Sequence, residues 1–445
     1  MSGNIDSKSL CSTSDGIINE FDLSTVDLVT EAEIEDICDD FENNSSLSRY
    51  LIIKCFHFLL TMLGWMPFGT DNYRHRKVFA CINIIFPISC TTVLILGYAG
   101  NMVAVTQKFT PVEQANYTCG KFSSYSNIFI AYEIPDILNF MSYIYGLFYY
   151  RYNGTFLGNT LDKVLWKCKK SEVTKEMNSA FQFKLGWLFT LVIFWFAASL
   201  TSFAAIGILQ SKYCQLCFFQ YKIDTPFTLF HLKFWLIVLV IFGKIFYYMV
   251  YLVIIANYII MCEITLYSFQ CVSSDIAQKC LPIKEMIHDI WSISCHISFL
   301  NMDVGRNASI CLLFIAYNIC YYSLIWAELI KVYFKADNEN NCVLICLISM
   351  GVILFSWILL AMFPIVQACR VNTIERRLQK LALEMRLFGY TNATIDELDS
   401  FLSFVSICQM KAKLLWLRIS AGKFTLLSSC LLLATLFFIK YDLSS

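Results

Sequence analysis

The sequence predicts an all-helical membrane protein with seven transmembrane spans, and three observations support that fold class. Apolar residues make up 57% of the 445 residues and charged residues only 15%, whereas soluble domains carry about 25% charged residues. Lys and Arg are concentrated in alternate connections between the apolar stretches. Seven predominantly apolar stretches are also long enough for a helix to cross a bilayer, which needs ~20 apolar residues: residues 78–104, 127–150, 185–208, 234–258, 307–330, 343–366 and 422–440.

The composition excludes several other classes of protein. The formal net charge is zero, so the chain offers no basic surface and we expect no nucleic-acid partner. With 7 Pro and 17 Gly it is neither collagen-like nor of low complexity. It contains no Gly-rich phosphate loop, HExxH or GxSxG motif, and its five histidines are scattered. We therefore expect neither an enzyme nor a bound cofactor or metal.

The chain ahead of the first span has two parts. Residues 1–50 contain 12 acidic and 2 basic side chains, which is typical of a solvated and largely disordered tail. Residues 51–76 open with an apolar run that Lys54 and His57 interrupt and that Pro67 ends. We interpret this segment as an interfacial helix lying along the membrane. It is neither a span nor a cleaved signal peptide, because a signal peptide opens with a basic region.

The loop charges predict a cytoplasmic N-terminus and an extracellular C-terminus. Connections on one side of the membrane contain 24 Lys and Arg, and those on the other side contain 8. Positive residues stay cytoplasmic. Asn116 then lies outside and is the candidate glycosylation site. The outer loops also carry cysteines that face an oxidising space; the disulfide candidates, with no pairing assigned, are Cys119, Cys214, Cys217 and Cys342.

Residues 370–421 predict two cytoplasmic anchor helices. The first covers residues 370–388 and ends at Gly389, which suits a left-handed C-cap. The second starts at Thr394, where Glu397 completes a capping box. Its apolar stripe either packs on its own subunit or contacts another. The stripe predicts one continuous helix leading into the seventh span, through Leu398, Phe401, Leu402, Val405, Cys408, Ala412, Leu415 and Ile419.

Ionisable residues lie inside two predicted spans, where a charge is costly and tends to be functional. Glu133 and Asp136 in span two are three residues apart, so they share a helix face. Lys244 in span four lies at about the depth of Asp136. Two roles remain open for this group: a polar ligand or gating site, and a structural ion pair.

Aromatic side chains in spans three to six are candidates for lining a small-molecule pocket. Packing and anchoring at the membrane interface are the alternative roles. The ligand-binding candidates among them are Trp195, Tyr317 and Tyr321. If the protein senses light, Trp195 and Trp326 are the candidate absorbers.

Three short motifs follow the pattern of a known receptor family. They are residues 63–68 (LGWMPF), residues 396–398 (DEL) and residues 421–426 (AGKFTL) at the start of span seven. Together with the inner N-terminus and seven spans, they resemble the insect gustatory receptor superfamily over residues 50–440. The family's C-terminal hallmark is Thr-Tyr, five apolar residues and Gln-Phe, whereas residues 435–441 read TLFFIKY. The chain thus resembles a divergent member, as in the nematode gustatory-receptor-like branch.

The resemblance implies a homo- or hetero-tetramer of related subunits embedded in membrane lipid. A small-molecule ligand would bind in the outer half of spans two to six, within residues 77–369. Residues 370–421 would anchor the assembly, and residues 422–445 would contribute the seventh span to a cation pore. The implied pore-lining stripe is Ser429, Leu433, Leu436 and Lys440.

Within that stripe, Leu433 and Leu436 would form a hydrophobic gate that closes by dewetting. Lys440 is a difficulty, because four ammonium groups at the outer mouth would repel cations. Either Lys440 points to lipid headgroups, or Asp442 neutralises it, or the chain does not conduct cations by itself. We favour the first, because lysines at span ends commonly reach the headgroups in this way.

The sequence therefore favours a gustatory-receptor-like chemoreceptor subunit of the plasma membrane, acting as a ligand-gated cation channel in sensory perception such as taste. A photoreceptor or hydrogen peroxide sensor on the same scaffold is the first alternative. A G-protein-coupled receptor is the second, and the inverted orientation and the absence of proline from span seven disfavour it. A transporter is the third, and no internal repeat supports it.

The charge asymmetry makes a direct topological prediction. An epitope at residue 2 should be labelled by antibody only after the cells are permeabilised. An epitope after Ser445 should be labelled on intact cells. Surface labelling of the N-terminal epitope would contradict both the orientation and the family resemblance.

Overall fold

The described part of the chain belongs to one compact unit. The chain divides into Met1–Leu51 and Ile52–Ser445, and the computed structural model describes residues of the second unit alone. These are residues 56, 58–67, 76–106, 134–169, 174–212, 230–278, 281–335, 341–390, 393–408, 410–415, 417 and 418.

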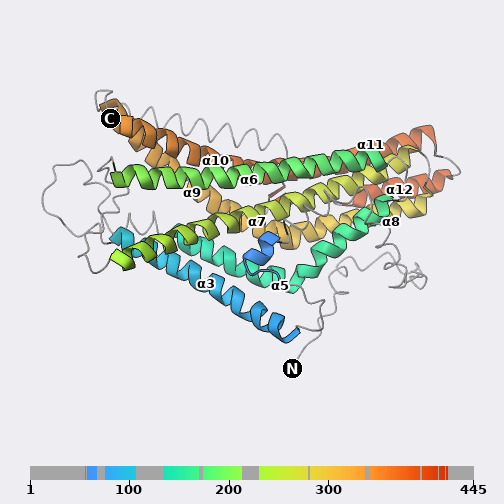
Figure 1. Cartoon of the computed structure of the whole chain (residues 1–445). Helices are drawn as coiled ribbons and strands as arrows, with labels where there is room; N and C mark the ends of the chain where they lie inside the picture. The colour runs from blue at the N-terminus through green and yellow to red at the C-terminus, as the bar shows by residue number, and fades with distance from the viewer. Residues whose placement is uncertain are drawn as a thin grey trace. The chain divides into compact units, whose positions relative to one another are not determined.

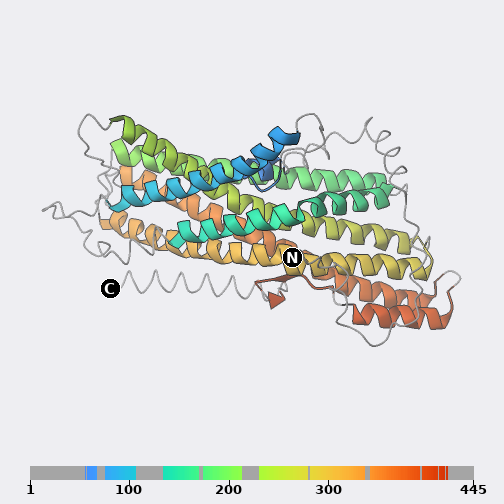
Figure 2. The same cartoon turned by 90° about the horizontal axis from the view of Figure 1, so that it is seen from below.

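Long helices dominate this unit (Figures 1 and 2). They are α3 (Arg76–Thr106), α5 (Ile134–Lys169), α6 (Thr174–Lys212), α7 (Phe230–Ala277), α9 (Gly305–Lys335) and α10 (Asn341–Val371). The shorter elements are α8 (Ile283–Phe299), the π-helix η7 (Leu300–Val304), α11 (Thr373–Phe388), α12 (Ile395–Ile407), β1 (Lys413–Leu414) and β2 (Leu417–Arg418). Predicted spans one to six fall on the six long helices, in order. A helix suits these apolar runs because it satisfies its backbone hydrogen bonds internally, as lipid requires.

Several of these helices meet the requirements of a membrane span. Within the described residues, four stretches are long and apolar enough to cross a bilayer: Cys81–Ala99, Ile241–Ala277, Gly305–Ala327 and Leu347–Phe388. A shorter apolar helix, Gly186–Ser202, lies on predicted span three. Predicted span two lies on α5, which is not among the four, and span seven lies outside the described residues. The chain is a helical, multi-span membrane protein, while the count of seven and its orientation stay predictions.

Helix α7 lies at the centre of the unit. It contacts α3, α5, α6, α8, α9, α10 and α11, and every residue from Val250 to Ile259 is buried. A helix that is apolar on all sides is expected to be surrounded in this way. Helices α3 and α7 lie close together at two glycines, since a Cβ on Gly97 would lie 2.8 Å from the Cα of Gly243. Small residues of this kind let membrane helices pack backbone to backbone.

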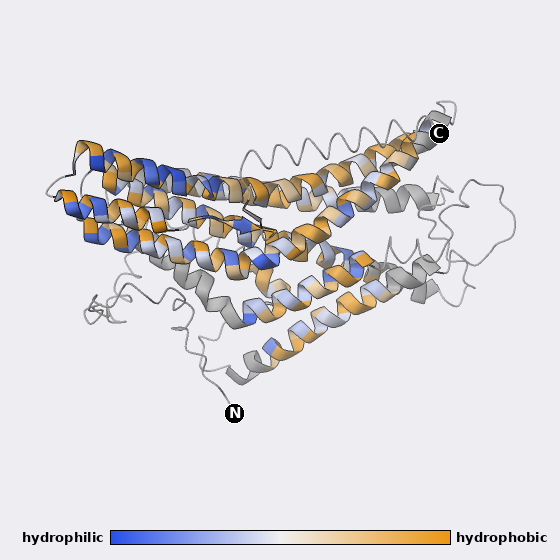
Figure 3. Cartoon of the chain, turned by 180° about the vertical axis from the view of Figure 1, so that it is seen from behind, coloured by the Kyte–Doolittle hydropathy of each residue, from blue (hydrophilic) through white to orange (hydrophobic). Residues whose placement is uncertain are grey.

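The hydropathy of the residues changes along the length of the helices. Hydrophilic residues gather toward the end where α8, α11 and α12 lie, and hydrophobic residues dominate the other end (Figure 3). Large apolar side chains are exposed on α3, α6 and α10 within predicted spans, which suits contact with lipid tails. Examples are Ile84, Ile85, Ile88, Phe194 and Phe355.

The segment containing the LGWMPF motif packs into the bundle. Trp65 is fully buried and stacks on Tyr150 of α5, with ring centroids 5.1 Å apart. The Tyr143 hydroxyl donates to the Leu63 carbonyl over 2.9 Å. Gly64 has a φ of +71°, which glycine adopts at no steric cost. The prediction that residues 51–76 lie along the membrane interface is not tested by this packing.

The two predicted anchor helices correspond to α11 and α12, with α11 beginning at Thr373 after a break that follows Val371. Helix α11 ends at Phe388, and its C-cap Gly389 has φ +73° and ψ 156°, so the left-handed helical C-cap predicted there is wrong. The capping box predicted at the start of α12 is present. The Thr394 Oγ1 accepts from the Glu397 N–H over 3.3 Å, and the Glu397 carboxylate accepts from the Thr394 N–H over 2.9 Å. Arg386 of α11 forms an ion pair with Asp399 of α12, which joins the two helices.

The prediction of a continuous helix to Ile419 is wrong. Helix α12 ends at Ile407, and Cys408 has the extended conformation φ −62°, ψ 109°. Strands β1 and β2 then pair antiparallel, with Leu415 between them at φ +54°. The apolar spacing favours a helix here, but side chains from other elements form hydrogen bonds with the backbone of residues 411–415 and stabilise an extended conformation instead. We call residues 408–418 the linker.

Buried cysteines in the described residues behave as small apolar side chains. Cys262, Cys311 and Cys408 are buried and free. Burial and, to a smaller extent, the nearby Cys295 raise the pKa of the Cys408 thiol to about 11. The Cys408 thiol is therefore protonated and unreactive at neutral pH.

The contact of Trp65 with α5 predicts the effect of one methyl group. A Cβ on Gly146 would lie 2.5 Å from the Trp65 ring, so Gly146→Ala should lower the free energy of unfolding by about 1–3 kcal/mol. Gly186→Ala is the matched control, since a Cβ there meets nothing within 4 Å, and it should be neutral or stabilising by about 0.5–1 kcal/mol. Thermal unfolding of the purified chain in detergent measures both. Equal effects would contradict the packing of Trp65.

Candidate functional site

The predicted charged residues of two spans meet inside the bundle. The Lys244 Nζ of α7 lies 3.3 Å from the Asp136 Oδ1 of α5, and the two side chains are 19% and 7% exposed. The Lys244 Nζ also lies 4.7 Å from the centroid of the Tyr247 ring, a cation–π distance. The ammonium group is thus held on two sides, by a carboxylate and by an aromatic face.

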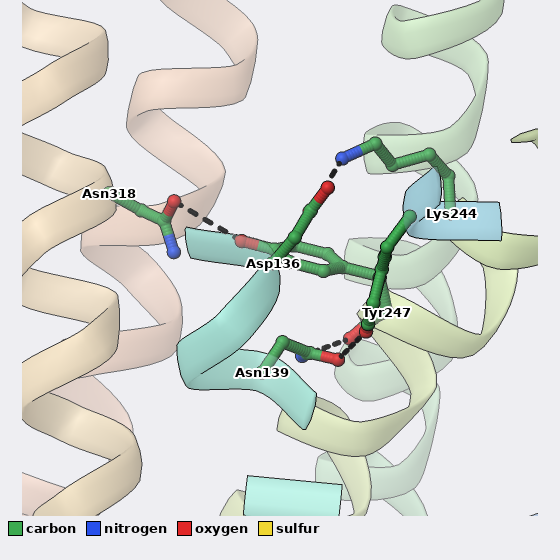
Figure 4. A network of polar contacts seen from close by, with 6 residues as sticks. Asp136, Asn139, Lys244, Tyr247 and Asn318 are labelled. Carbon is green, nitrogen blue, oxygen red and sulfur yellow. Dashed lines mark hydrogen bonds and ion pairs between the residues drawn. The ribbon is translucent and has the colours of Figure 1, made fainter. Parts of the chain in front are cut away.

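Hydrogen bonds extend this ion pair into a network that joins four helices (Figure 4). Asn139 of α5 accepts from the Tyr98 hydroxyl of α3. It also donates to the Tyr247 carbonyl of α7 over 3.1 Å. The Tyr247 hydroxyl donates to the Asn318 Oδ1 of α9 over 3.2 Å. We call these residues, with Asp136 and Lys244, the polar network.

The spacing of the network residues explains why they converge. Asp136 and Asn139 are three residues apart on α5, and Lys244 and Tyr247 are three apart on α7, so each pair shares one helix face. Asn139 is fully buried, and its two amide atoms are both used. A buried amide left unpaired would cost about 1–3 kcal/mol, so these contacts specify how α3, α5 and α7 pack.

An aromatic cluster lies directly against the network. It contains five rings from α6, α7 and α10, which contact one another with centroid separations of 5.1–6.3 Å. Most of the contacts are edge-to-face, the geometry that aromatic pairs favour. Tyr247 belongs to both groups. The aromatic cluster consists of Trp195, Tyr247, Tyr248, Tyr251 and Trp357.

One polar group of the aromatic cluster, the Trp357 indole N–H, is buried without a hydrogen-bond partner among the described residues. By contrast, the Trp195 indole N–H donates to the Ser356 carbonyl over 2.7 Å. Native proteins leave few buried donors unpaired. An unpaired donor is therefore a position where a small polar molecule would gain a hydrogen bond.

The remaining ligand-binding candidates are placed differently. Tyr317 and Tyr321 lie half-buried on α9, and the hydrogen bonds of the polar network do not include them. Tyr321 contacts the ring of Tyr322 with a 5.4 Å centroid separation. Trp326 donates to the Leu347 carbonyl over 3.2 Å. Glu133 lies outside the described residues.

Other candidate sites fall outside the part of the chain that the structure describes. They are the pore stripe Ser429, Leu433, Leu436 and Lys440, the sequon at Asn116, and the cysteines Cys119, Cys214 and Cys217. Cys342 lies in the first turn of α10, and its side chain is not described.

Sequence reasoning missed the two amides of the polar network and a second buried charge. Asn139 and Asn318 are amides within apolar stretches, and that isolation was the available signal. Glu263 of α7 is buried and pairs with Arg370 at the end of α10. Gln367 donates to the same carboxylate over 2.9 Å. This second group joins α7 to α10 about five turns from Lys244 along α7.

Comparisons with known proteins show similarity to solved structures. Neither the protein-family models nor the curated proteins match this chain. Among solved structures, it is similar to the insect olfactory receptor OR5 from Machilis hrabei, in complex with eugenol, with a TM-score of 0.49 and 12% identity. The alignment covers 88% of this chain and 98% of that chain. At this score and identity, neither residue roles nor function transfer from it.

The ion pair makes a prediction about paired and single substitutions. Asp136→Asn leaves the Lys244 ammonium without its carboxylate, and breaking a buried pair costs about 3–5 kcal/mol, whereas replacing both partners is often neutral. Asp136→Asn alone should therefore lower surface expression and thermal stability more than Asp136→Asn with Lys244→Met. Additive losses from the two single changes would show that the side chains do not interact in the folded protein.

Proposed function

We propose that the chain is a chemoreceptor subunit of the plasma membrane, a ligand-gated cation channel that detects a small molecule. The observation that carries the proposal is the Asp136–Lys244 pair buried between α5 and α7. A buried ion pair adds little net stability compared with apolar packing. Charges kept at this depth in a membrane protein are functional candidates for that reason.

The chemistry of the site supports a ligand with an apolar body and an oxygen acceptor. Lys244 is the more exposed partner of the pair, and a carbonyl, hydroxyl or carboxylate oxygen would compete with Asp136 for its ammonium. The Trp357 indole N–H is a further donor for such a molecule. The rings of the aromatic cluster would supply apolar contact.

The pore and the assembly are parts of the same proposal and rest on the sequence resemblance. Residues 422–445 would line a cation pore in a homo- or hetero-tetramer. The anchor would comprise α11, α12 and the linker, which replaces the continuous helix expected there. On the same resemblance, the small molecule that the receptor detects would be a taste compound.

A photoreceptor or peroxide sensor is the second candidate, and the aromatic cluster is the observation that favours it. The rings of Trp195 and Trp357 lie 5.8 Å apart, and both are buried. Three tyrosines contact them. Coupled indole rings of this kind would absorb ultraviolet light, and their neighbours would exchange electrons with an excited indole.

Whole-cell recording separates the two candidates. Cells that express the chain would be exposed to a panel of small molecules, to hydrogen peroxide, and to blue and ultraviolet light. The ligand proposal expects a chemically evoked cation current whose half-maximal concentration shifts at least about tenfold in Lys244→Met, the loss of one charge-assisted hydrogen bond. A current evoked by light alone, and abolished in Trp357→Phe, would support the second candidate instead.

The pore proposal makes a separate prediction at Lys440. If this lysine points to lipid headgroups, Lys440→Glu should leave single-channel cation conductance within about twofold, because a headgroup-level charge is screened over ~8 Å. Ser429→Glu on the predicted stripe is the contrasting variant and should change conductance strongly. A large rise in cation current with Lys440→Glu would instead place the ammonium in the pore.

A further inference from the structure

Polar side chains from other elements bind the backbone of the linker. The Asn301 side chain of η7 donates to the Lys411 carbonyl over 2.8 Å. The same side chain accepts from the Lys413 N–H over 2.6 Å. This amide pairs with alternate residues of an extended chain, as a neighbouring strand would.

Two further side chains complete the attachment. The Asn372 Oδ1, at the junction of α10 and α11, accepts from the Ala412 N–H over 2.6 Å. The Ser309 Oγ of α9 accepts from the Leu415 N–H over 2.8 Å. Ala412 is fully buried, so its N–H requires a partner within the protein. We call Asn301, Ser309 and Asn372 the clamp.

The backbone beneath the linker is shaped for close approach. The clamp residue Asn301 lies in a π-helical turn, a feature frequent at functional sites. Gly305 follows this turn, and a Cβ there would lie 2.6 Å from the Leu300 carbonyl oxygen and 3.2 Å from that of Lys413. Glycine therefore permits both the turn and the contact with the linker.

Helix α9 forms one hydrogen bond in the polar network and another with the linker. Asn318 accepts from Tyr247 in the polar network, and Ser309 accepts from the linker. The two residues are nine positions apart, which is about 13–14 Å along one helix at ~1.5 Å per residue. A rigid helix of that length transmits a shift at one end to the other.

We propose that α9 couples the polar network to the linker, so that loss of the Tyr247–Asn318 hydrogen bond loosens the clamp. The linker leads into residues 419–445, the predicted seventh span. An effect of this coupling on a pore rests on the proposed function. The coupling between the polar network and the linker does not depend on that proposal. Individual neutral hydrogen bonds contribute little net stability, so the clamp can open without unfolding α9.

Hydrogen–deuterium exchange of the full chain in lipid nanodiscs tests the coupling without a ligand. Deuterium uptake would be followed in peptides that cover residues 408–418, because the backbone N–H groups of Ala412, Lys413 and Leu415 donate to the clamp. Ser309→Ala and Asn301→Ala should speed exchange in the linker by about fivefold, the effect of losing one or two hydrogen bonds. Ser309→Ala is the milder variant and serves if Asn301→Ala does not fold.

The decisive variant is distant from the linker. Tyr247→Phe removes only the hydroxyl that donates to α9 and should speed linker exchange by at least about threefold. Tyr248→Phe is the matched control, because it removes the hydroxyl of the neighbouring ring of the aromatic cluster, and linker exchange should not change. Thermal unfolding of each variant separates a local effect from a global loss of stability.

Each outcome has a separate meaning. Unchanged linker exchange in both clamp variants would overturn the clamp. Faster exchange in the clamp variants, with Tyr247→Phe equal to Tyr248→Phe, would overturn the coupling through α9. If exchange behaves as expected and no stimulus evokes a current, the coupling stands and the channel proposal fails.

Discussion

The burial of the Lys244 ammonium constrains the packing of the central helices. A charge at this depth needs a partner, and Asp136 supplies it from α5. One turn further along both helices, Asn139 binds the Tyr247 carbonyl. Two contacts at matching spacing fix the sliding and the rotation of α5 against α7. Tyr98 and Asn318 then attach α3 and α9 to the same point.

Tyr247 is the residue at which polar and aromatic contacts meet. Its hydroxyl binds α9, its ring lies under the Lys244 ammonium, and its edge contacts Trp357 of α10. A molecule that competes for Lys244 would therefore affect three helices through one side chain. This sharing of one side chain would let a bound molecule change the contacts between helices, in addition to stabilising their packing.

The sequence predicted the long helices well, because apolar runs of this length have few alternatives in lipid. It also predicted that Asp136 and Lys244 lie at one depth, and the capping box at Thr394, since both follow from local spacing. It failed at residues 408–419, where helical periodicity competes with side chains more than a hundred positions away, such as Asn301. Asn139 and Asn318 were missed for a related reason, because an amide becomes informative only once its partner is known.

Cation flux into proteoliposomes that contain only the purified chain tests the central claim most directly, because it requires no companion subunit and no cellular signalling. We expect stimulus-dependent flux above that of protein-free vesicles, altered in Tyr247→Phe and unchanged in Gly186→Ala at equal protein density, because a Cβ on Gly186 meets nothing within 4 Å. Identical flux in the two variants, or no flux under any chemical stimulus or light, would contradict a channel controlled through the polar network.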